Sequence, residues 1–364
     1  MHIHTQPSLN VNVKTEASQD AFDRRRRTRT AALLVAILIL IVVFICALGL
    51  GRTAISPGVV VGILAHDLFG LSANYTEAQH TIVMSVRLPR VAAAVVAGGA
   101  LSVAGAAYQG LFRNPMVSPD ILGASAGASF GAALGLLIGV GTQLVQIFAF
   151  SMGFIAVALT MVLSRSLSRE RTSALTIVLC GLVVQTLFQS FVSVIKYTAD
   201  PDSKLPEITY WLMGSLAKIT WSDLAVLCVP VVIGMLPILF LRWRLNTLAF
   251  GEDTAASLGV SVRTLRSILI VCATLLTSSV VAMAGVVGWV GLVVPHLARF
   301  LGGSDNRSAI PLSLVVGSAS MLVVDTACRS LMASEIPLGL LTSIVGAPFF
   351  IFVLARTQGK KGHE

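Results

Sequence analysis

Charged residues are scarce in this chain of 364 residues: Asp, Glu, Lys and Arg together make up 12%, against about 25% in an average soluble protein. Because 55% of the residues are hydrophobic, the chain could not cover a folded domain with polar side chains. A soluble globular protein is therefore excluded, and most of the surface is expected to face lipid.

Motifs for catalysis are also missing. The sequence contains no G-x-x-x-x-G-K-[ST] phosphate-binding loop, no nucleophile elbow, no HExxH and no paired-carboxylate motif. We therefore expect no catalytic residue, and this chain cannot hydrolyse ATP by itself.

Cysteine is sparse, and no CxxC pair or metal-ligand spacing occurs. We expect no metal site and interpret the thiols as small residues packed between helices; they are Cys46, Cys180, Cys228, Cys272 and Cys328. The net charge of +9 does not indicate nucleic-acid binding, because the basic residues lie between apolar segments instead of forming a stripe on a soluble domain.

What the chain has in abundance is long apolar runs. Residues 1–30 are polar without hydrophobic periodicity, and we predict a disordered cytoplasmic tail that ends in the basic cluster at 24–29. Each later run must be helical, because backbone amides in hydrocarbon have to be satisfied within the segment. The predicted spans are 31–51, 91–111, 121–141, 144–164, 174–195, 222–241, 267–284, 286–301, 309–328 and 336–355. The sequence thus predicts an all-α polytopic membrane protein with ten transmembrane helices within residues 31–356, followed by a short cytoplasmic tail at 357–364.

Orientation follows from the distribution of Lys and Arg. If the N-terminus lies in the cytoplasm, 19 of the 26 basic residues fall on the cytoplasmic side and 7 on the outer side. This asymmetry favours both termini in the cytoplasm and an even number of spans.

The longest polar interruption on the cytoplasmic side is residues 245–266. Leu248, Ala255, Leu258 and Val262 can share one helical face, which suggests two short helices joined by a turn at Gly259. Such a pair either packs on a partner protein or lies at the membrane interface.

Several ordered motifs give a resemblance to a known family. They are Arg87-Leu88-Pro89-Arg90, Arg113-Asn114-Pro115-Met116-x-x-Pro119, Gly251-Glu252-x-x-Ala255-x-x-Leu258-Gly259, Gly291-Leu292-Val293-x-Pro295-His296, Pro337-x-Gly339 and Gly346-Ala347-Pro348-x-Phe350. Over residues 31–356 the chain resembles the FecCD permeases of ABC importers, which take up ferric siderophores, haem and vitamin B12.

The resemblance implies a ten-helix bundle that pairs as a homodimer or with a close paralogue. Two separate ATPase subunits, which bind ATP and Mg, and a periplasmic binding protein would complete the importer in a bacterial inner membrane. The resemblance places coupling to the ATPase at Gly251, Glu252, Ala255, Leu258 and Gly259.

Other roles carried over from the family concern the two faces of the membrane. Arg87, Arg90 and Arg329 match positions that pair with carboxylates of the binding protein; alternatively, they anchor helix ends by snorkelling. One part of a cytoplasmic gate matches Asn114 and Met116, and another matches Thr172 and Ser173, where a tight turn and an N-cap are the alternatives. From helix position alone, Gln185, Gln189 and Ser193 are expected to line the pathway. A short outer helix is expected within 207–220.

The sequence leaves alternatives open for both the substrate and the energy source. A ferric siderophore is chosen on family frequency, with haem or cobalamin as alternatives. An ion-gradient transporter would need functional acids inside the membrane, and Asp325 is the single clear candidate, four residues before Arg329 and therefore able to pair with it locally.

Overall fold

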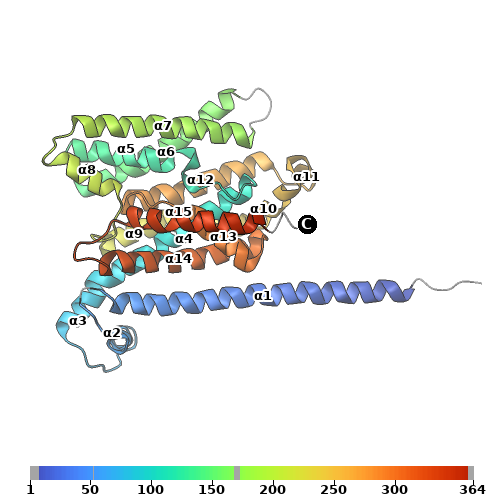
Figure 1. Ribbon diagram of the computed structural model, residues 1–364, viewed down its shortest axis with the longest axis horizontal. Helices are drawn as coiled ribbons and strands as arrows, with labels where there is room; N and C mark the ends of the chain where they lie inside the picture. Colours follow the sequence, from blue (N-terminus) through green and yellow to red (C-terminus); the bar gives the residue numbers. More distant parts are fainter. Residues whose placement is uncertain (1–7, 52, 168–172, 360–364) are drawn as a thin grey trace, which may run out of the picture.

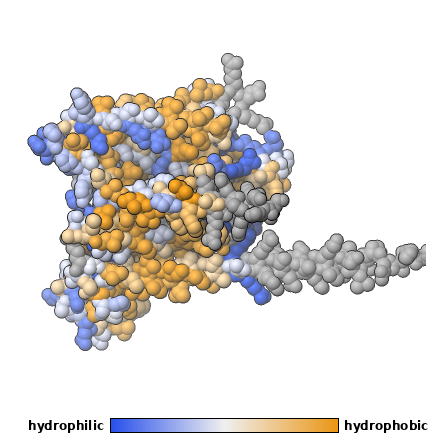
Figure 2. Space-filling model, in the orientation of Figure 1, coloured by the Kyte–Doolittle hydropathy of each residue, from blue (hydrophilic) through white to orange (hydrophobic). Residues whose placement is uncertain are grey.

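A computed structural model describes residues 8–51, 53–167 and 173–359, and within these ranges the chain is helical with irregular connections and no strand. Figure 1 shows a bundle whose longer helices run side by side, with α4 enclosed by the others. Apolar side chains form a broad band between two more polar ends on the face shown in Figure 2. We call these ends the α8 end and the α11 end, after the short helices that lie there.

Seven helices of the described residues are long and apolar enough to cross a membrane. Five are single whole helices, one is the second part of α1, and one combines α3, η1 and α4. In chain order they are α1 (Ser8–Gly49, through its part at 27–49), α3 (Glu77–Thr81) with η1 (Ile82–Arg87) and α4 (Leu88–Leu111), α6 (Thr142–Leu167), α7 (Ala174–Thr198), α9 (Trp221–Leu241), α12 (Val262–Ala284) and α14 (Asn306–Ser330).

The other three predicted spans correspond to α5 (Ala124–Leu137), α13 (Val290–Gly302) and α15 (Leu338–Gly359). At 1.5 Å per residue the 14 residues of α5 cover about 21 Å, less than the hydrocarbon thickness of about 30 Å. The short 3-10 helix η2 (Pro119–Leu122) precedes α5, and such irregular backbone is tolerated where protein surrounds it. The all-α fold with ten predicted helical segments is confirmed.

Two features differ from the prediction. The first helix begins at Ser8, so the structure continues α1 through residues 8–30, where the sequence predicted a disordered tail; neither Gly nor Pro interrupts this stretch. Helix α2 (Pro57–Phe69), which the sequence reading left in an outer loop, has Ser56 as its N-cap, Pro57 in its first turn and Gly70 in a left-handed conformation after its end. Its 13 residues are too few for a span, so the length of its apolar run does not predict it.

The centre of the bundle is built on close backbone approach. A Cβ atom added at Gly98 would lie 2.3 Å from the carbonyl oxygen of Gly317 on α14, and one added at Gly105 would collide with the backbone of Gly291 on α13. Small residues therefore bring α4 against both helices, as is common between helices in lipid. The outward faces of α1 and α9 remain largely exposed, as expected for surfaces in contact with lipid.

Candidate functional site

Two arginines hold the end of the first span. Arg87 donates hydrogen bonds to the carbonyls of Leu48 (2.7 Å) and Gly49 (2.9 Å), and Arg329 donates to the carbonyl of Leu50 (2.7 Å) and to that of Ala47. Both arginines are 6% exposed. The last carbonyls of a helix have no partner within the helix, so these two guanidinium groups from η1 and α14 satisfy the end of α1.

The third arginine joins two carboxylates. Nε of Arg90 lies 2.9 Å from Oδ1 of Asp325, and Nη1 lies 3.0 and 3.1 Å from the two carboxylate oxygens of Glu335. Asp325 is fully buried and also lies 3.5 Å from Nε of Arg329. The predicted local pair of Asp325 and Arg329 is therefore present, but Arg90 is the closer partner, and the sequence carried no signal for Glu335.

This arginine group (Arg87, Arg90 and Arg329) lies at the α8 end, where docking was predicted, but all three side chains are directed into the protein. Their hydrogen-bond partners are carbonyl and carboxylate groups of the same chain. A snorkelling arginine would instead extend its guanidinium group toward water. Docking of a binding protein on them stays a prediction, and any such contact has to be made beside or in exchange for these internal bonds.

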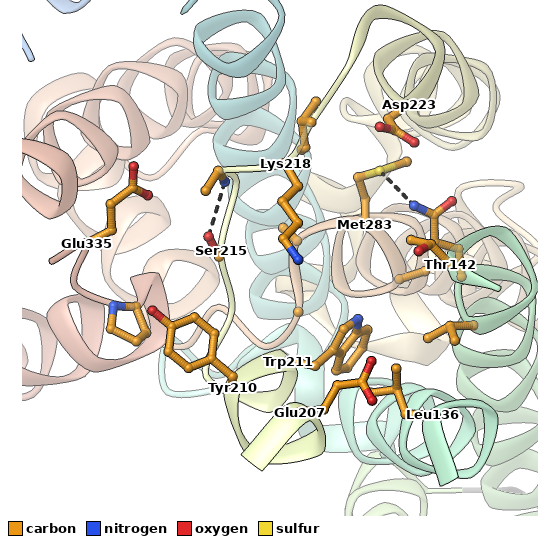
Figure 3. Close-up of a pocket in the computed structure, with 18 of the residues that line it drawn as sticks. Leu136, Thr142, Glu207, Tyr210, Trp211, Ser215, Lys218, Asp223, Met283 and Glu335 are labelled. Carbon is orange, nitrogen blue, oxygen red and sulfur yellow. Dashed lines mark hydrogen bonds between the residues drawn. The ribbon is translucent and has the colours of Figure 1, made fainter. Parts of the chain in front are cut away.

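A cavity of about 780 Å³ opens next to this group. Glu335 stands at its edge, and Figure 3 shows Lys218 extending into it, opposite the aromatic side chains of α8 (Lys204–Leu212). Its charged and aromatic lining residues are Glu207, Tyr210, Trp211, Lys218, Asp223 and Glu335. Helix α8 is the predicted short outer helix, although it ends at Leu212 and the chain then turns through Gly214.

The predicted coupling segment lies at the opposite end, beside the label of α11 in Figure 1. It consists of α10 (Arg244–Thr247), η3 (Leu248–Phe250) and α11 (Glu252–Ser257). The turn between the short helices is at Gly251, whose φ of 105° favours glycine, whereas Gly259 leads from α11 into α12. The prediction of a helical pair is met, but its turn at Gly259 was misplaced.

One face of this segment is buried in the bundle, and the other carries exposed apolar side chains. Leu248 and Ala255 are buried, but Leu258, expected on the same face, is 62% exposed, as is Phe250 at 73%. The side chain of Glu252 contacts Arg266 on α12. Two large apolar side chains thus stand exposed next to acidic residues at a polar end of the molecule, and the sequence reading missed Phe250 because it considered the buried face only.

Asp305 ties this segment to the rest of the bundle. Its carboxylate accepts a hydrogen bond from Arg29 on α1 (2.8 Å) and another from Asn246 on α10 (2.8 Å), and it caps α14 through the backbone N–H of Arg307 (2.9 Å). The backbone N–H of Asn306 donates in turn to Asn246. One carboxylate therefore joins the first span, the coupling segment and the start of α14.

The predicted gate residues lie at the same α11 end. The side-chain oxygen of Asn114 accepts from the backbone N–H of Met116 at 2.9 Å, and both residues are exposed. Ser173 caps α7 by accepting from the backbone N–H of Thr176, which is the cap alternative noted above. Thr172 lies outside the described residues.

The predicted pathway residues lie on α7. Gln189 and Ser193 are exposed and Gln185 is half-buried, and the exposed Thr186 and Ser190 add to the same polar stretch. The opposite face of α7 is buried against η2 and α5, with Gly181 close to the carbonyl of Ile121. The hydroxyls of Thr186, Ser190 and Ser193 donate to backbone carbonyls within α7, but glutamine amides in the middle of a span are unfavourable against lipid. This face is therefore expected to contact protein or water.

A cluster near α2 was not foreseen. Asp67 accepts from both His66 (3.1 Å) and His80 (3.0 Å), while the hydroxyl of Tyr75 lies 2.9 Å from Nδ1 of His66. No local sequence pattern signals the loop that brings Tyr75 back to α2. The imidazoles lower the pKa of Asp67.

Comparison with known proteins decides what this arrangement belongs to. The model of the FecCD transport family matches residues 39–356. This chain belongs to the FecCD transport family. It is accordingly a multi-pass membrane permease of the ABC importer type.

FecCD relatives carry different substrates in their names. The chain is 36% identical to the molybdate import system permease protein MolB of Haemophilus influenzae over 306 residues, which is 84% of this chain and 90% of that protein. It is also 36% identical to the hemin transport system permease protein HmuU of Yersinia pestis over 302 residues, 81% of this chain and 88% of that protein. A metal-chelate type ABC transporter solved in an inward-facing conformation has a TM-score of 0.80 and 34% identity, with 89% of this chain and 98% of that chain covered.

Proposed function

We propose that this FecCD permease imports a metal chelate, specifically a ferric siderophore, from the periplasm to the cytoplasm, with energy from ATP hydrolysis in separate subunits. The observation that carries the coupling to an ATPase is the exposure of Phe250 and Leu258 at a polar end of the molecule. Apolar side chains of this size outside the apolar band favour contact with another protein.

In this proposal the α11 end is cytoplasmic and the α8 end is periplasmic. The short helices α10 and α11 sit on an ATPase subunit, with Phe250 and Leu258 entering its surface and Glu252 held in place by Arg266. Movement of the segment reaches α1 and α14 through Asp305, which bonds to Arg29 and Asn246. No ATP or Mg binds to this chain.

The pathway is proposed to run between two copies of the chain. The exposed polar stretch of α7 (Gln185, Thr186, Gln189, Ser190 and Ser193) would then face a shared aqueous passage instead of lipid. Asn114 and Met116, with Ser173, lie near its cytoplasmic end as gate residues. A homodimer is favoured, because the polar stretch of α7 in one copy would face the same stretch in the other. A close paralogue is the second candidate for the partner permease.

The substrate class is tested by uptake and ATPase measurements together. The permease, copurified with its ATPase, is reconstituted into liposomes and supplied with binding proteins loaded with a ferric siderophore, haemin, cobalamin or molybdate. Stimulation of ATP hydrolysis and uptake by the ferric siderophore alone supports the proposal. Stimulation by another substrate corrects the cargo, whereas uptake that follows an ion gradient without any ATPase overturns the mechanism.

A further inference from the structure

The two carboxylates on Arg90 differ in how firmly they are held. Asp325 is fully buried, lies within α14 and contacts two guanidinium groups. The side chain of Glu335 is 31% exposed, lies in the irregular connection between α14 and α15, and is bonded to Nη1 of Arg90 alone among the described residues. Removing Asp325 would leave buried positive charges unpaired, whereas Glu335 can leave Arg90 with little desolvation cost.

The surroundings leave room for Glu335 to move. It stands at the edge of the cavity of about 780 Å³ shown in Figure 3. The preceding residues 330–334 are exposed, so the carboxylate can turn away from Arg90 into open space without disturbing packed side chains.

The chain after Glu335 is tied to other elements. The backbone N–H of Ile336 donates to the carbonyl of Cys328, and those of Leu338 and Gly339 donate to the carbonyls of Gly214 and Met213, just after α8. A displacement of Glu335 therefore reaches both the start of α15 and the end of α8.

We propose that Glu335 is an internal latch: it occupies on Arg90 the place of a carboxylate of the docking protein, and docking exchanges one carboxylate for the other. This inference rests on the proposed function, since it names how a binding protein engages the arginine group. Because one carboxylate replaces the other, the net charge around Arg90 is unchanged. The docking carboxylate therefore adds no further repulsion with Asp325. The released Glu335 then moves the connection that leads to α15 and α8.

A latch and a purely structural brace predict opposite changes in the affinity for the binding protein when Glu335 is neutralised. In Glu335→Gln the competitor is weakened while Arg90 and Asp325 stay paired, so the binding protein that stimulates the wild-type complex binds about tenfold more tightly, the value of roughly one charge-assisted hydrogen bond. A brace predicts unchanged or weaker binding. The affinity is measured at low ionic strength with the permease–ATPase complex in lipid nanodiscs.

Glu207→Gln is the matched control. Glu207 lines the same cavity but pairs with Lys204 at 3.2 Å, so its neutralisation reports the general electrostatic field. The latch requires that the affinity for the binding protein rises less than about twofold in this variant. Equal gains in both variants, or no gain in Glu335→Gln, overturn the latch while stimulation of the wild type leaves the proposed function standing.

A second measurement needs no binding protein. Hydrogen exchange of the complex is compared between wild type and Glu335→Gln; faster exchange over 331–337 with unchanged exchange in α14 is expected. Unchanged exchange over 331–337 overturns the latch. If no binding protein stimulates the wild type, the proposed function fails on that result, and the exchange measurement still decides whether Glu335 restrains this connection.

Discussion

The contact between α4 and α13 can be tested by a single methyl group. A Cβ atom at Gly105 would lie 1.7 Å from the carbonyl oxygen of Gly291 and 2.7 Å from its carbonyl carbon. Ordinary contacts begin at 3.4 Å, so the backbones would have to separate by roughly 3.4 − 1.7 = 1.7 Å. Because the obstacle is backbone, no side-chain rotation relieves it.

We expect Gly105→Ala to destabilise the permease by about 3 kcal/mol or more, at or above the upper part of the range for overpacked cores. Gly110→Ala is the matched control on the same helix, because its nearest neighbour, Oδ1 of Asn306, would lie at an ordinary 3.4 Å. The control should be neutral or slightly stabilising, since alanine is the better helix former by about 1 kcal/mol.

The assay is the loss of monodisperse protein after heating in detergent, measured for both variants and the wild type. A lower melting temperature for Gly105→Ala alone is expected. If the two variants melt together, the close approach of α4 and α13 is not what holds this part of the bundle, and the reasoning from small residues fails.

Three further predictions follow from other contacts. Burial alone would raise the pKa of Asp305, but hydrogen bonds from the Arg307 backbone and Asn246, together with Arg29, outweigh burial and lower the pKa. The stabilisation that Asp305 gives is therefore complete above the pKa of an unfolded aspartate and is lost as pH falls through the pKa of the folded state. On acidification, the melting temperature should therefore fall less in Asp305→Asn than in the wild type. Phe250→Ser with Leu258→Ser should reduce copurification of the ATPase subunit without lowering the melting temperature of the permease, and undiminished copurification would remove the proposed contact surface. Arg87→Lys should cost about 1–3 kcal/mol, because one ammonium cannot replace the guanidinium on the carbonyls that end α1; a melting temperature equal to that of the wild type would contradict the capping role.

Much of the fold could be predicted because lipid imposes a strong one-dimensional pattern. Ten apolar runs predicted ten helical segments, and each was helical because unsatisfied backbone is costly in hydrocarbon. The motifs of the family also predicted a coupling segment and a group of docking arginines, and both roles stay predictions. Helix α2 and the helical part of the tail were missed, since neither is long and apolar enough to count as a span.

What the sequence by itself determined was the class of protein, the number of spans and the family, since all three depend on local hydrophobicity and short motifs. Only the tertiary structure decided that Arg90 joins Asp325 to Glu335, 235 and 245 residues away, and that Phe250 and Leu258 point outward. Pairing across such separations depends on how helices pack, and a local pattern of residue types contains no record of which faces meet.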